Sequence, residues 1–505
     1  MKNGHFAIVN IGASAFRMII SEYIDGKEKT LEYMVTPLSL GRDTFTKGYI
    51  SLENVYKATD ILRNFKLKME EYKIDKNYKA LCTSGVREAQ NRYFFIDYIR
   101  INAGIDLTIL EPSDEIYIKY VGIREDLKDF SFFEKKGLLF ANISSGNVAI
   151  SIHKEKIMIY SAALPYGSLR LNEIFKYVPI INKYKAYEQY VTNMFYTIRS
   201  ALPQKFKFQY VVASGSSINL LIDLLNPEKN LFKKKDLINL FDLVKTMDVN
   251  SIIKEHNIRQ TDAEILLPTL ITYINLLLFT DKDEIHFSRT PFPLLLSLYY
   301  SNTIKDKELH KRLRKSFYYF GSRFYFDRNH AKVVSKYALE IFDNLKPILS
   351  LGSKERFLLE VSAILHEIGY FINARNHEEH SYHIIKALNF PGFSREDVTI
   401  VALVALLHRE NPDKSYENIL MALSIDKRLV VNKLVSILRI ADALDANHSK
   451  LIRDIKIILI NDKLRVIVKA LKHPFLEEHS FKRKSNLFLE TFGINPELEV
   501  KIDYE

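Results

Sequence analysis

The sequence predicts an α/β protein with two similar lobes, followed by an all-helical domain and a small α/β region. Three observations lead to this prediction. A pattern of strands and turns at residues 6–41 recurs at residues 138–170. Each copy is followed by alternating helical and strand-like segments, which is typical of α/β layers. From about residue 305 long helical patterns replace the strands, and alternating apolar residues return only near residue 450.

Each copy of the repeat carries a turn of small residues between two apolar strands. The first turn reads Asn10-Ile11-Gly12-Ala13-Ser14-Ala15, and the second reads Asn142-Ile143-Ser144-Ser145-Gly146-Asn147. A second strand, a short charged turn and a third strand follow, and each copy closes with Pro and a Gly-containing loop. Small residues let the main chain approach an anion closely. The recurrence predicts two related units that form a cleft lined by two anion-binding turns.

The segments after each copy complete the two lobes. A helix is predicted at residues 51–72 and a strand at 78–84, and a second pair follows at 184–201 and 208–214. The most apolar helix candidate, at residues 265–279, contains Pro and Asn and is short for a bilayer. We therefore interpret it as a buried helix and expect no membrane partner.

The last two hundred residues change character. Apolar residues recur at helical spacing through most of the chain between residues 305 and 448. IKIILIND and KLRVIVKA then predict a hairpin. The sequence therefore predicts lobe I at residues 1–125, lobe II at 126–302, a helical domain at 303–448 and an α/β region at 449–505.

The composition is that of an ordinary soluble globular protein with a basic surplus. Hydrophobic residues make up 47% and charged residues 26% of the 505 residues. The net charge of +11 favours phosphate-rich ligands weakly, although clusters such as Lys482-Arg483-Lys484 are more typical of solvated helix faces. The single cysteine, Cys82, excludes an internal disulfide and fits a reducing compartment. Residues 1–20 lack a signal-peptide pattern, so we expect a cytoplasmic protein. We also expect no specific nucleic-acid partner.

A set of motifs in register along the chain resembles one family. The chain is similar to the exopolyphosphatase/guanosine pentaphosphate phosphohydrolase family, whose lobes belong to the actin–Hsp70–sugar kinase superfamily with its ribonuclease H-like fold. The resemblance covers nearly the full length. The motifs in the lobes are NIGASAFRM, TSGVREAQNR at 83–92, EPSDEIYIKYVG at 111–122, LLFANISSGN at 138–147, LPYGSLRLNE at 164–173, VVASGSS at 211–217 and FSRTPFPLLL at 287–296.

The resemblance implies an activity and its residues. The family hydrolyses the terminal phosphate of polyphosphate or guanosine pentaphosphate with Mg²⁺ and a water-activating glutamate, which corresponds to Glu115; members often dimerise. A carboxylate beside a polyanion has a raised proton affinity and can act as a base. The alternative is that Glu115 is an ordinary exposed glutamate in the first turn of a helix, where the helix dipole favours a negative charge. The residues expected to bind phosphate are Gly12, Ala13, Ser14, Arg17, Arg87, Ser144, Ser145, Gly146, Asn147, Ser214, Gly215 and Ser216.

Three departures from the family pattern affect the metal. Asn10 and Asn142 replace the aspartates with which the two family loops begin, and Ala149 replaces a later glutamate. An asparagine keeps one acceptor oxygen but loses the charge that holds a hard cation. The residues thus indicate a degraded Mg²⁺ site at Asn10 and Asn142. Either the enzyme works with a rearranged metal site, or the cleft binds polyphosphate or an alarmone nucleotide as a regulatory protein without turnover.

The helical domain resembles an HD-type phosphohydrolase domain. Its metal-binding positions correspond to His330, His366, Glu367 and Asp442, with glutamate in place of the usual aspartate. A second metal could bind to three additional histidines, since imidazole suits transition ions. The alternatives are buried, hydrogen-bonded histidines without metal, a role as a substrate-channel wall, a role in binding or dimerisation, and hydrolysis through this domain alone. The additional histidines are His377, His380 and His408.

Overall fold

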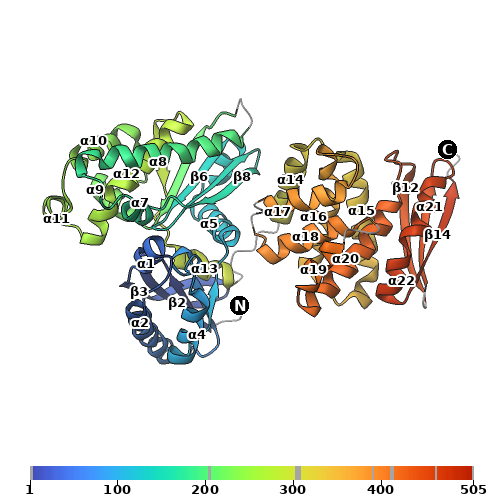
Figure 1. Cartoon of the computed structure of the whole chain (residues 1–505), viewed down its shortest axis with the longest axis horizontal. Helices are drawn as coiled ribbons and strands as arrows, with labels where there is room; N and C mark the ends of the chain where they lie inside the picture. The colour runs from blue at the N-terminus through green and yellow to red at the C-terminus, as the bar shows by residue number, and fades with distance from the viewer. Residues whose placement is uncertain are drawn as a thin grey trace. The chain divides into compact units, whose positions relative to one another are not determined.

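The chain forms two compact units, Met1–Lys307 and Glu308–Glu505. The computed structural model describes residues 4–202, 206–301, 309–388, 390, 392–409, 414–460 and 463–502. Figure 1 shows the first unit from blue to yellow-green and the second from yellow to red.

Lobe I of the first unit is built on a five-stranded sheet with the order β3-β2-β1-β4-β5. The first three strands are antiparallel neighbours, and β4 and β5 join the sheet in parallel. The apolar positions of the sheet and its helices form one buried core. The strands are β1(Gly4–Ile11), β2(Ala15–Ile24), β3(Lys27–Pro37), β4(Tyr78–Cys82) and β5(Leu107–Ile109), and the helices are α1(Leu40–Lys47), α2(Leu52–Glu71), α3(Ser84–Arg87), α4(Arg92–Ala103) and α5(Pro112–Asp126).

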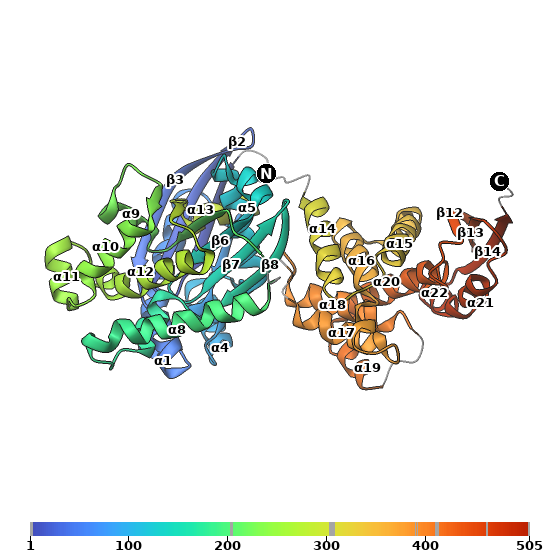
Figure 2. The ribbon, with the colours of Figure 1, turned by 90° about the horizontal axis from the view of Figure 1, so that it is seen from above.

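Lobe II repeats this topology. In its sheet, β10-β11-β9-β6-β7-β8, three antiparallel strands again precede a parallel neighbour, so the predicted internal repeat is confirmed. Figures 1 and 2 show its long helices α8 and α12 side by side. The strands are β6(Leu138–Ile143), β7(Val148–Lys154), β8(Ile157–Leu164), β9(Tyr210–Gly215), β10(Leu231–Lys233) and β11(Glu284–Phe287), and the helices are α6(Phe130–Lys136), α7(Ser168–Ile174), α8(Ile180–Ser200), α9(Ile218–Leu225), α10(Lys234–Val244), α11(Val249–His256) and α12(Gln260–Thr280).

Helix α12 contains the apolar segment that the sequence interpreted as a buried helix. By length and composition it could cross a membrane, but 72% of its most apolar window is buried inside the protein. Pro268 lies within the helix, and both Pro268 and Thr269 are buried. The burial agrees with the interpretation of this segment as a core helix.

Helix α13(Phe292–Tyr300) packs on lobe I, although the predicted boundaries place it in lobe II. It contacts β1, β2 and α5, and the Tyr23 hydroxyl lies 2.7 Å from Ser297 Oγ. A Cβ atom at Gly122 of α5 would lie 2.6 Å from Leu295 Cδ2, so glycine allows this close helix contact. The chain therefore returns to lobe I after completing lobe II, which local sequence patterns do not reveal.

The second unit combines the predicted helices with the predicted C-terminal hairpin. Parallel strand β14 adds to that hairpin, giving the order β12-β13-β14, and one hydrophobic core joins helices and sheet. The elements are α14(Leu309–Ser322), α15(Arg328–Leu349), α16(Ser353–Leu365), the 3₁₀ helix η1(Ile368–Phe371), α17(His377–Ala387), α18(Arg395–Leu407), α19(Lys414–Met421), α20(Ile425–Ala443), β12(Ile452–Ile460), β13(Lys463–Ala470), α21(Phe475–Lys484), α22(Asn486–Phe492) and β14(Asn495–Ile502).

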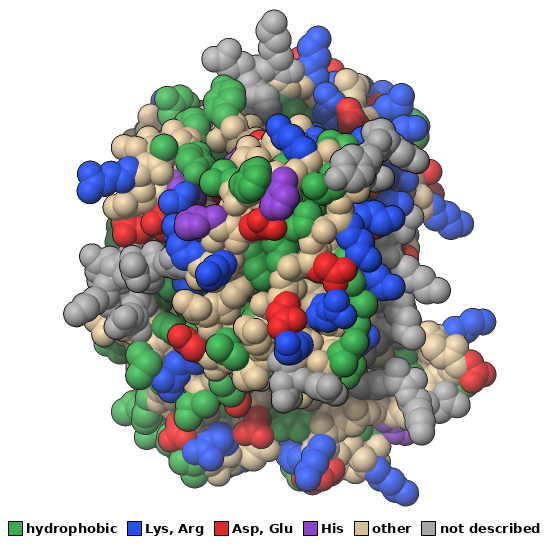
Figure 3. All heavy atoms as spheres, turned by 90° about the vertical axis from the view of Figure 1, so that its right-hand side faces the viewer, with side chains coloured by type: hydrophobic (Ala, Val, Ile, Leu, Met, Phe, Trp, Pro, Cys, Tyr) green, Lys and Arg blue, Asp and Glu red, His purple; other side chains and the backbone are tan. Residues whose placement is uncertain are grey.

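Basic side chains on the surface are mixed with acidic ones. Figure 3 shows Lys and Arg side chains interspersed with Asp and Glu on one face. One member of a basic cluster behaves differently, because Lys484 is buried and donates to Asp442 Oδ2. The expectation that the cluster at residues 482–484 is simply a solvated helix face is therefore wrong for Lys484.

Candidate functional site

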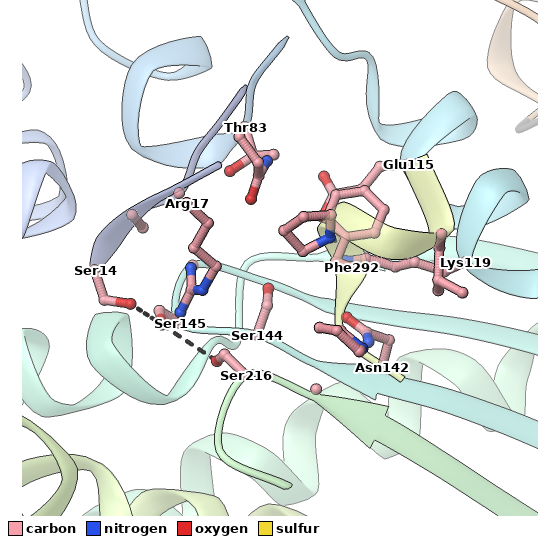
Figure 4. Close-up of a pocket in the computed structure, with 18 of the residues that line it drawn as sticks. Ser14, Arg17, Thr83, Glu115, Lys119, Asn142, Ser144, Ser145, Ser216 and Phe292 are labelled. Atoms are coloured by element: carbon pink, nitrogen blue, oxygen red, sulfur yellow. Dashed lines mark hydrogen bonds and ion pairs between the residues drawn. The ribbon is translucent and has the colours of Figure 1, made fainter. Parts of the chain in front are cut away.

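The two small-residue turns meet between the lobes of the first unit. Ser14 Oγ of the first turn lies 2.8 Å from Ser145 Oγ of the second, and Ser145 Oγ lies 3.4 Å from Ser216 Oγ (Figure 4). A Cβ atom at Gly146 would overlap Ser84 Oγ of lobe I, so glycine allows the second turn to approach the other lobe. The predicted facing arrangement of the two turns is thus present.

The main chain of these turns presents unused donors. The carbonyls of Ser144 and Ser145 accept hydrogen bonds from the first amides of α7, which fixes the second turn. Within the described part of the chain, the amides of Ala13, Ser14, Ser145 and Gly146 donate no hydrogen bond. Free backbone N–H groups in a small-residue turn are suited to bind an anion.

These turns line an open cavity of about 130 Å³. Arg17, Lys119 and Arg289 supply its cationic side chains and Glu115 its one carboxylate among the described residues. Figure 4 shows Arg17 extending toward the second turn and Lys119 beside Phe292. Its lining residues are Asn10, Gly12, Ala13, Ser14, Arg17, Tyr33, Thr83, Ser84, Glu115, Lys119, Asn142, Ser144, Ser145, Gly146, Gly215, Ser216, Asn219, Arg289, Thr290, Pro291, Phe292, Pro293 and Leu295.

Glu115 lies in the first turn of α5 and is held between two cations. Lys119 Nζ is 2.6 Å from Glu115 Oε1, and Arg87 Nη1 is 3.2 Å from Glu115 Oε2. Burial raises the pKa of Glu115, but the charges of Lys119 and Arg87 outweigh it and bring the pKa to about 2. In the protein without a bound anion, Glu115 is therefore ionised, and the expected raised proton affinity applies to the state with a polyanion beside it.

Some of the predicted phosphate contacts lie behind the cavity lining. Arg87 does not line the cavity; its Nη1 donates to the Leu110 carbonyl at 2.6 Å and to Glu115. Ser214 Oγ accepts from Asn142 Nδ2 at 2.7 Å, and Asn147 holds the Ser144 hydroxyl at 2.6 Å. Arg87, which the resemblance implies as a phosphate ligand, instead has its guanidinium turned toward α5. Ser214 and Asn147 support residues that do line it.

In the second unit, four residues from separate helix ends form a buried cluster. One lies in the first turn of α15, two directly follow α16, and one lies near the end of α20. One ligand atom from each residue lies within 4.8 Å of those of the other three. Asp442 Oδ1 lies 3.3 Å from His330 Nε2 and 3.5 Å from His366 Nε2. The cluster consists of the four predicted residues His330, His366, Glu367 and Asp442.

Hydrogen bonds orient the histidines of this cluster. His330 Nδ1 lies 2.9 Å from Asp445 Oδ2, and His366 Nδ1 donates to the Ala363 carbonyl at 3.0 Å. The Nε2 atoms of both rings are buried without a hydrogen-bond partner. A ligating histidine characteristically uses one ring nitrogen for such a bond and the other for the metal.

Two of the three additional histidines extend the cluster. The ring of His408 lies 4.9 Å from that of His366 and 5.4 Å from that of His377, and both side chains are buried. Burial, followed by the charge of His366, lowers the pKa of His408 well below its usual value. His380 is only partly buried and lies outside the four-residue cluster.

Comparison with known proteins identifies the family. The model of the "Ppx/GppA phosphatase family" matches residues 19–290, and that of "Ppx/GppA phosphatase, domain III" matches residues 314–490. The chain belongs to the Ppx/GppA phosphatase family. A guanosine-5'-triphosphate,3'-diphosphate pyrophosphatase of Pseudoalteromonas translucida is 21% identical over 86% of both chains, and one of Vibrio vulnificus is 19% identical over 84% of both.

A solved structure supports the same fold. The exopolyphosphatase from Cytophaga hutchinsonii matches with a TM-score of 0.53 and 16% identity, over 59% of this chain and 98% of that chain. The predicted fold class, two actin/Hsp70-like lobes followed by a helical domain, is confirmed.

Within this Ppx/GppA cleft, the donor set does not fit Mg²⁺. Asn10 and Asn142 are neutral, and Ala149 stands directly opposite Asn142 in the sheet. The one carboxylate that lines the cavity among the described residues is already bonded to Lys119 and Arg87. Mg²⁺ requires oxygen ligands in near-ideal octahedral geometry and is usually held by carboxylates. The cleft has an ammonium group where such an ion would need negative charge.

The cluster in the second unit does fit a divalent metal ion. Two imidazoles and two carboxylates suit a transition-metal ion, and the Nε2 atoms without partners converge on one carboxylate oxygen. Burial lowers the pKa of His330, but Asp442, Asp445 and Glu367 together raise it to about 10. This environment favours a positive charge at the centre of the cluster.

Sequence reasoning missed several residues of both sites. Lys119 follows Glu115 by one helical turn, so the i,i+4 rule could have identified it. Arg289 lies within the motif FSRTPFPLLL, which carries the resemblance but predicts no role for this arginine. Asp445 follows Asp442 by three residues but contacts His330 from far along the chain, and Lys484 contacts Asp442 from a separate helix; no local pattern signals these contacts.

Proposed function

We propose that the chain hydrolyses the terminal phosphoanhydride of inorganic polyphosphate or guanosine pentaphosphate in the cleft of its first unit. The observation that carries the proposal is the pair of facing small-residue turns with unused amides beside the buried carboxylate of Glu115. The relatives named as guanosine-5'-triphosphate,3'-diphosphate pyrophosphatases support the nucleotide, and the solved exopolyphosphatase supports polyphosphate.

Each part of the cleft has a role in this proposal. The free amides of the two turns and the Arg17 guanidinium bind the terminal phosphate, because both donate hydrogen bonds to anionic oxygens. Glu115 is ionised and accepts a proton from the attacking water. A pKa near 2 makes it a weak base, and the negative charge of an arriving phosphate raises that pKa toward a useful range.

Release of orthophosphate tests the proposal. Purified protein is incubated with long-chain polyphosphate and, separately, with guanosine pentaphosphate. Glu115→Gln should reduce release by about 100-fold or more, as expected for loss of a general base. Glu125→Gln is the matched control, because Glu125 lies on the same helix but its side chain is 53% exposed. Binding of either compound without release would instead favour the regulatory alternative.

The buried cluster of the second unit supports a second candidate, a phosphohydrolase site that uses a divalent metal ion. His330, His366, Glu367 and Asp442 would hold the ion, with Asp445 orienting His330. A bound divalent ion lowers the pKa of water and polarises phosphoryl oxygens. Phosphate release that survives Glu115→Gln but is lost in His366→Ala would assign the hydrolysis to this unit.

A further inference from the structure

The cleft of the first unit contains a positive charge, that of Lys119, which has no role in the proposed reaction. Building on the proposed function, we infer that the cleft binds its terminal phosphate without a divalent metal ion and that Lys119 supplies the local positive charge. Lys119 is 2% exposed, lines the cavity, and lies 4.7 Å from the centre of the Phe292 ring. A buried ammonium group is costly unless it is paired and hydrogen-bonded.

Lys119 is only partly compensated by the protein. Its Nζ has three donors, and Glu115 is its one hydrogen-bond acceptor among the described residues. Glu115 is also shared with Arg87, so two cations face one carboxylate. One positive charge and two donors therefore remain available, and anionic phosphate oxygens would satisfy both.

The replaced metal positions also suit an anion. Asn10 is 3% exposed, lines the cavity, and leaves its Nδ2 without a hydrogen-bond partner. An amide N–H at this position donates to a phosphate oxygen, whereas it repels a cation. Asn142 Oδ1 is also unpaired, but one neutral oxygen does not replace the carboxylates that hold a hard ion.

Arg17 adds a second fixed charge close to the first turn. A Cβ atom at Gly12 would lie 3.2 Å from Arg17 Nη1, so the guanidinium lies directly over the turn. Lys119 and Arg17 thus come from different elements, α5 and β2, and line one cavity. Side-chain cations in a low-dielectric cleft can neutralise phosphate in the way that a bound metal would.

Calorimetric titration with inorganic tripolyphosphate tests this inference, once in EDTA and once in Mg²⁺. We expect the Kd in EDTA to remain within about threefold of that in Mg²⁺. Binding in Mg²⁺ alone would overturn the inference and leave the proposed function standing. No binding in either buffer would overturn the inference together with polyphosphate as the substrate of the proposed function.

Substitutions at Lys119 then test whether this residue supplies the positive charge that binds the phosphate. In EDTA, Lys119→Met should weaken tripolyphosphate binding by about 10- to 100-fold, as for loss of a charge-assisted hydrogen bond. Lys119→Arg, which keeps a cation, should retain most of the affinity and reports on folding. Lys57→Met on α2 is the control, since the Lys57 side chain is 56% exposed. Unchanged binding by a folded Lys119→Met protein would refute the role of Lys119.

Discussion

Replacing Glu115 should destabilise the first unit as well as reduce the proposed phosphate release. Glu115→Gln removes the negative charge that Lys119 and Arg87 share, and leaves both cations buried beside a neutral amide. The pKa of Glu115 is about 2, compared with an ordinary value of 4.5. At 1.36 kcal/mol per pH unit, this difference corresponds to about 3 kcal/mol of folding stability at neutral pH.

The sign of the pH dependence follows from the lowered pKa. The unfolded chain binds a proton at Glu115 more readily than the folded protein does, so the contribution is fully present above about pH 4.5. It is lost as the pH falls toward about 2. The free-energy difference between the wild type and Glu115→Gln should therefore shrink between these values.

Urea denaturation of the full chain measures this effect. The transition of the first unit should move to lower urea in Glu115→Gln, while the transition of the second unit serves as an internal reference. Adding Lys119→Met should recover part of the loss, because it removes one of the unpaired buried cations. Glu125→Gln should change neither transition. An unchanged first transition in Glu115→Gln, or a double variant that is merely additive, would refute the described ion triad.

Three other predictions concern the metal positions, the second cluster and the contact between helices. Asn10→Asp combined with Asn142→Asp should weaken calorimetric tripolyphosphate binding by about tenfold without creating Mg²⁺ dependence while Lys119 is present; a large Mg²⁺-dependent gain in phosphate release would contradict this. His366→Ala should lower the divalent metal content by about one ion per chain in elemental analysis, without affecting phosphate release in the cleft; equal metal content in both proteins would argue against the cluster as a metal site. Gly122→Val should destabilise the first unit by about 1–3 kcal/mol in urea, because the new side chain overlaps Leu295, and a wild-type transition would contradict the close packing of α5 and α13.

The repeated sequence pattern was sufficient to predict the architecture of the first unit. Each turn of small residues separates two strands that pair directly, so the local sequence determines the first three strands of each sheet. The four residues of the buried cluster were also identifiable, because the HD-type resemblance names specific residue types in order. Both correct predictions rest on patterns that are local in the sequence or shared with the family.

Contacts between distant segments could not be predicted in this way. The direction of Arg87 depends on the Leu110 carbonyl and on α5, and the placement of α13 depends on the lobe I sheet. The charge state of Glu115 depends on two side chains, only one of which is its helical neighbour. Such features arise from tertiary packing, which overrides local propensity.

A crystal structure of Glu115→Gln with tripolyphosphate tests most directly whether the cleft is the phosphate site. We expect the terminal phosphate between residues 12–14 and 144–146, in contact with Arg17 and Lys119. An anion bound only in the second unit, or only on the outer surface of the first, would contradict the account.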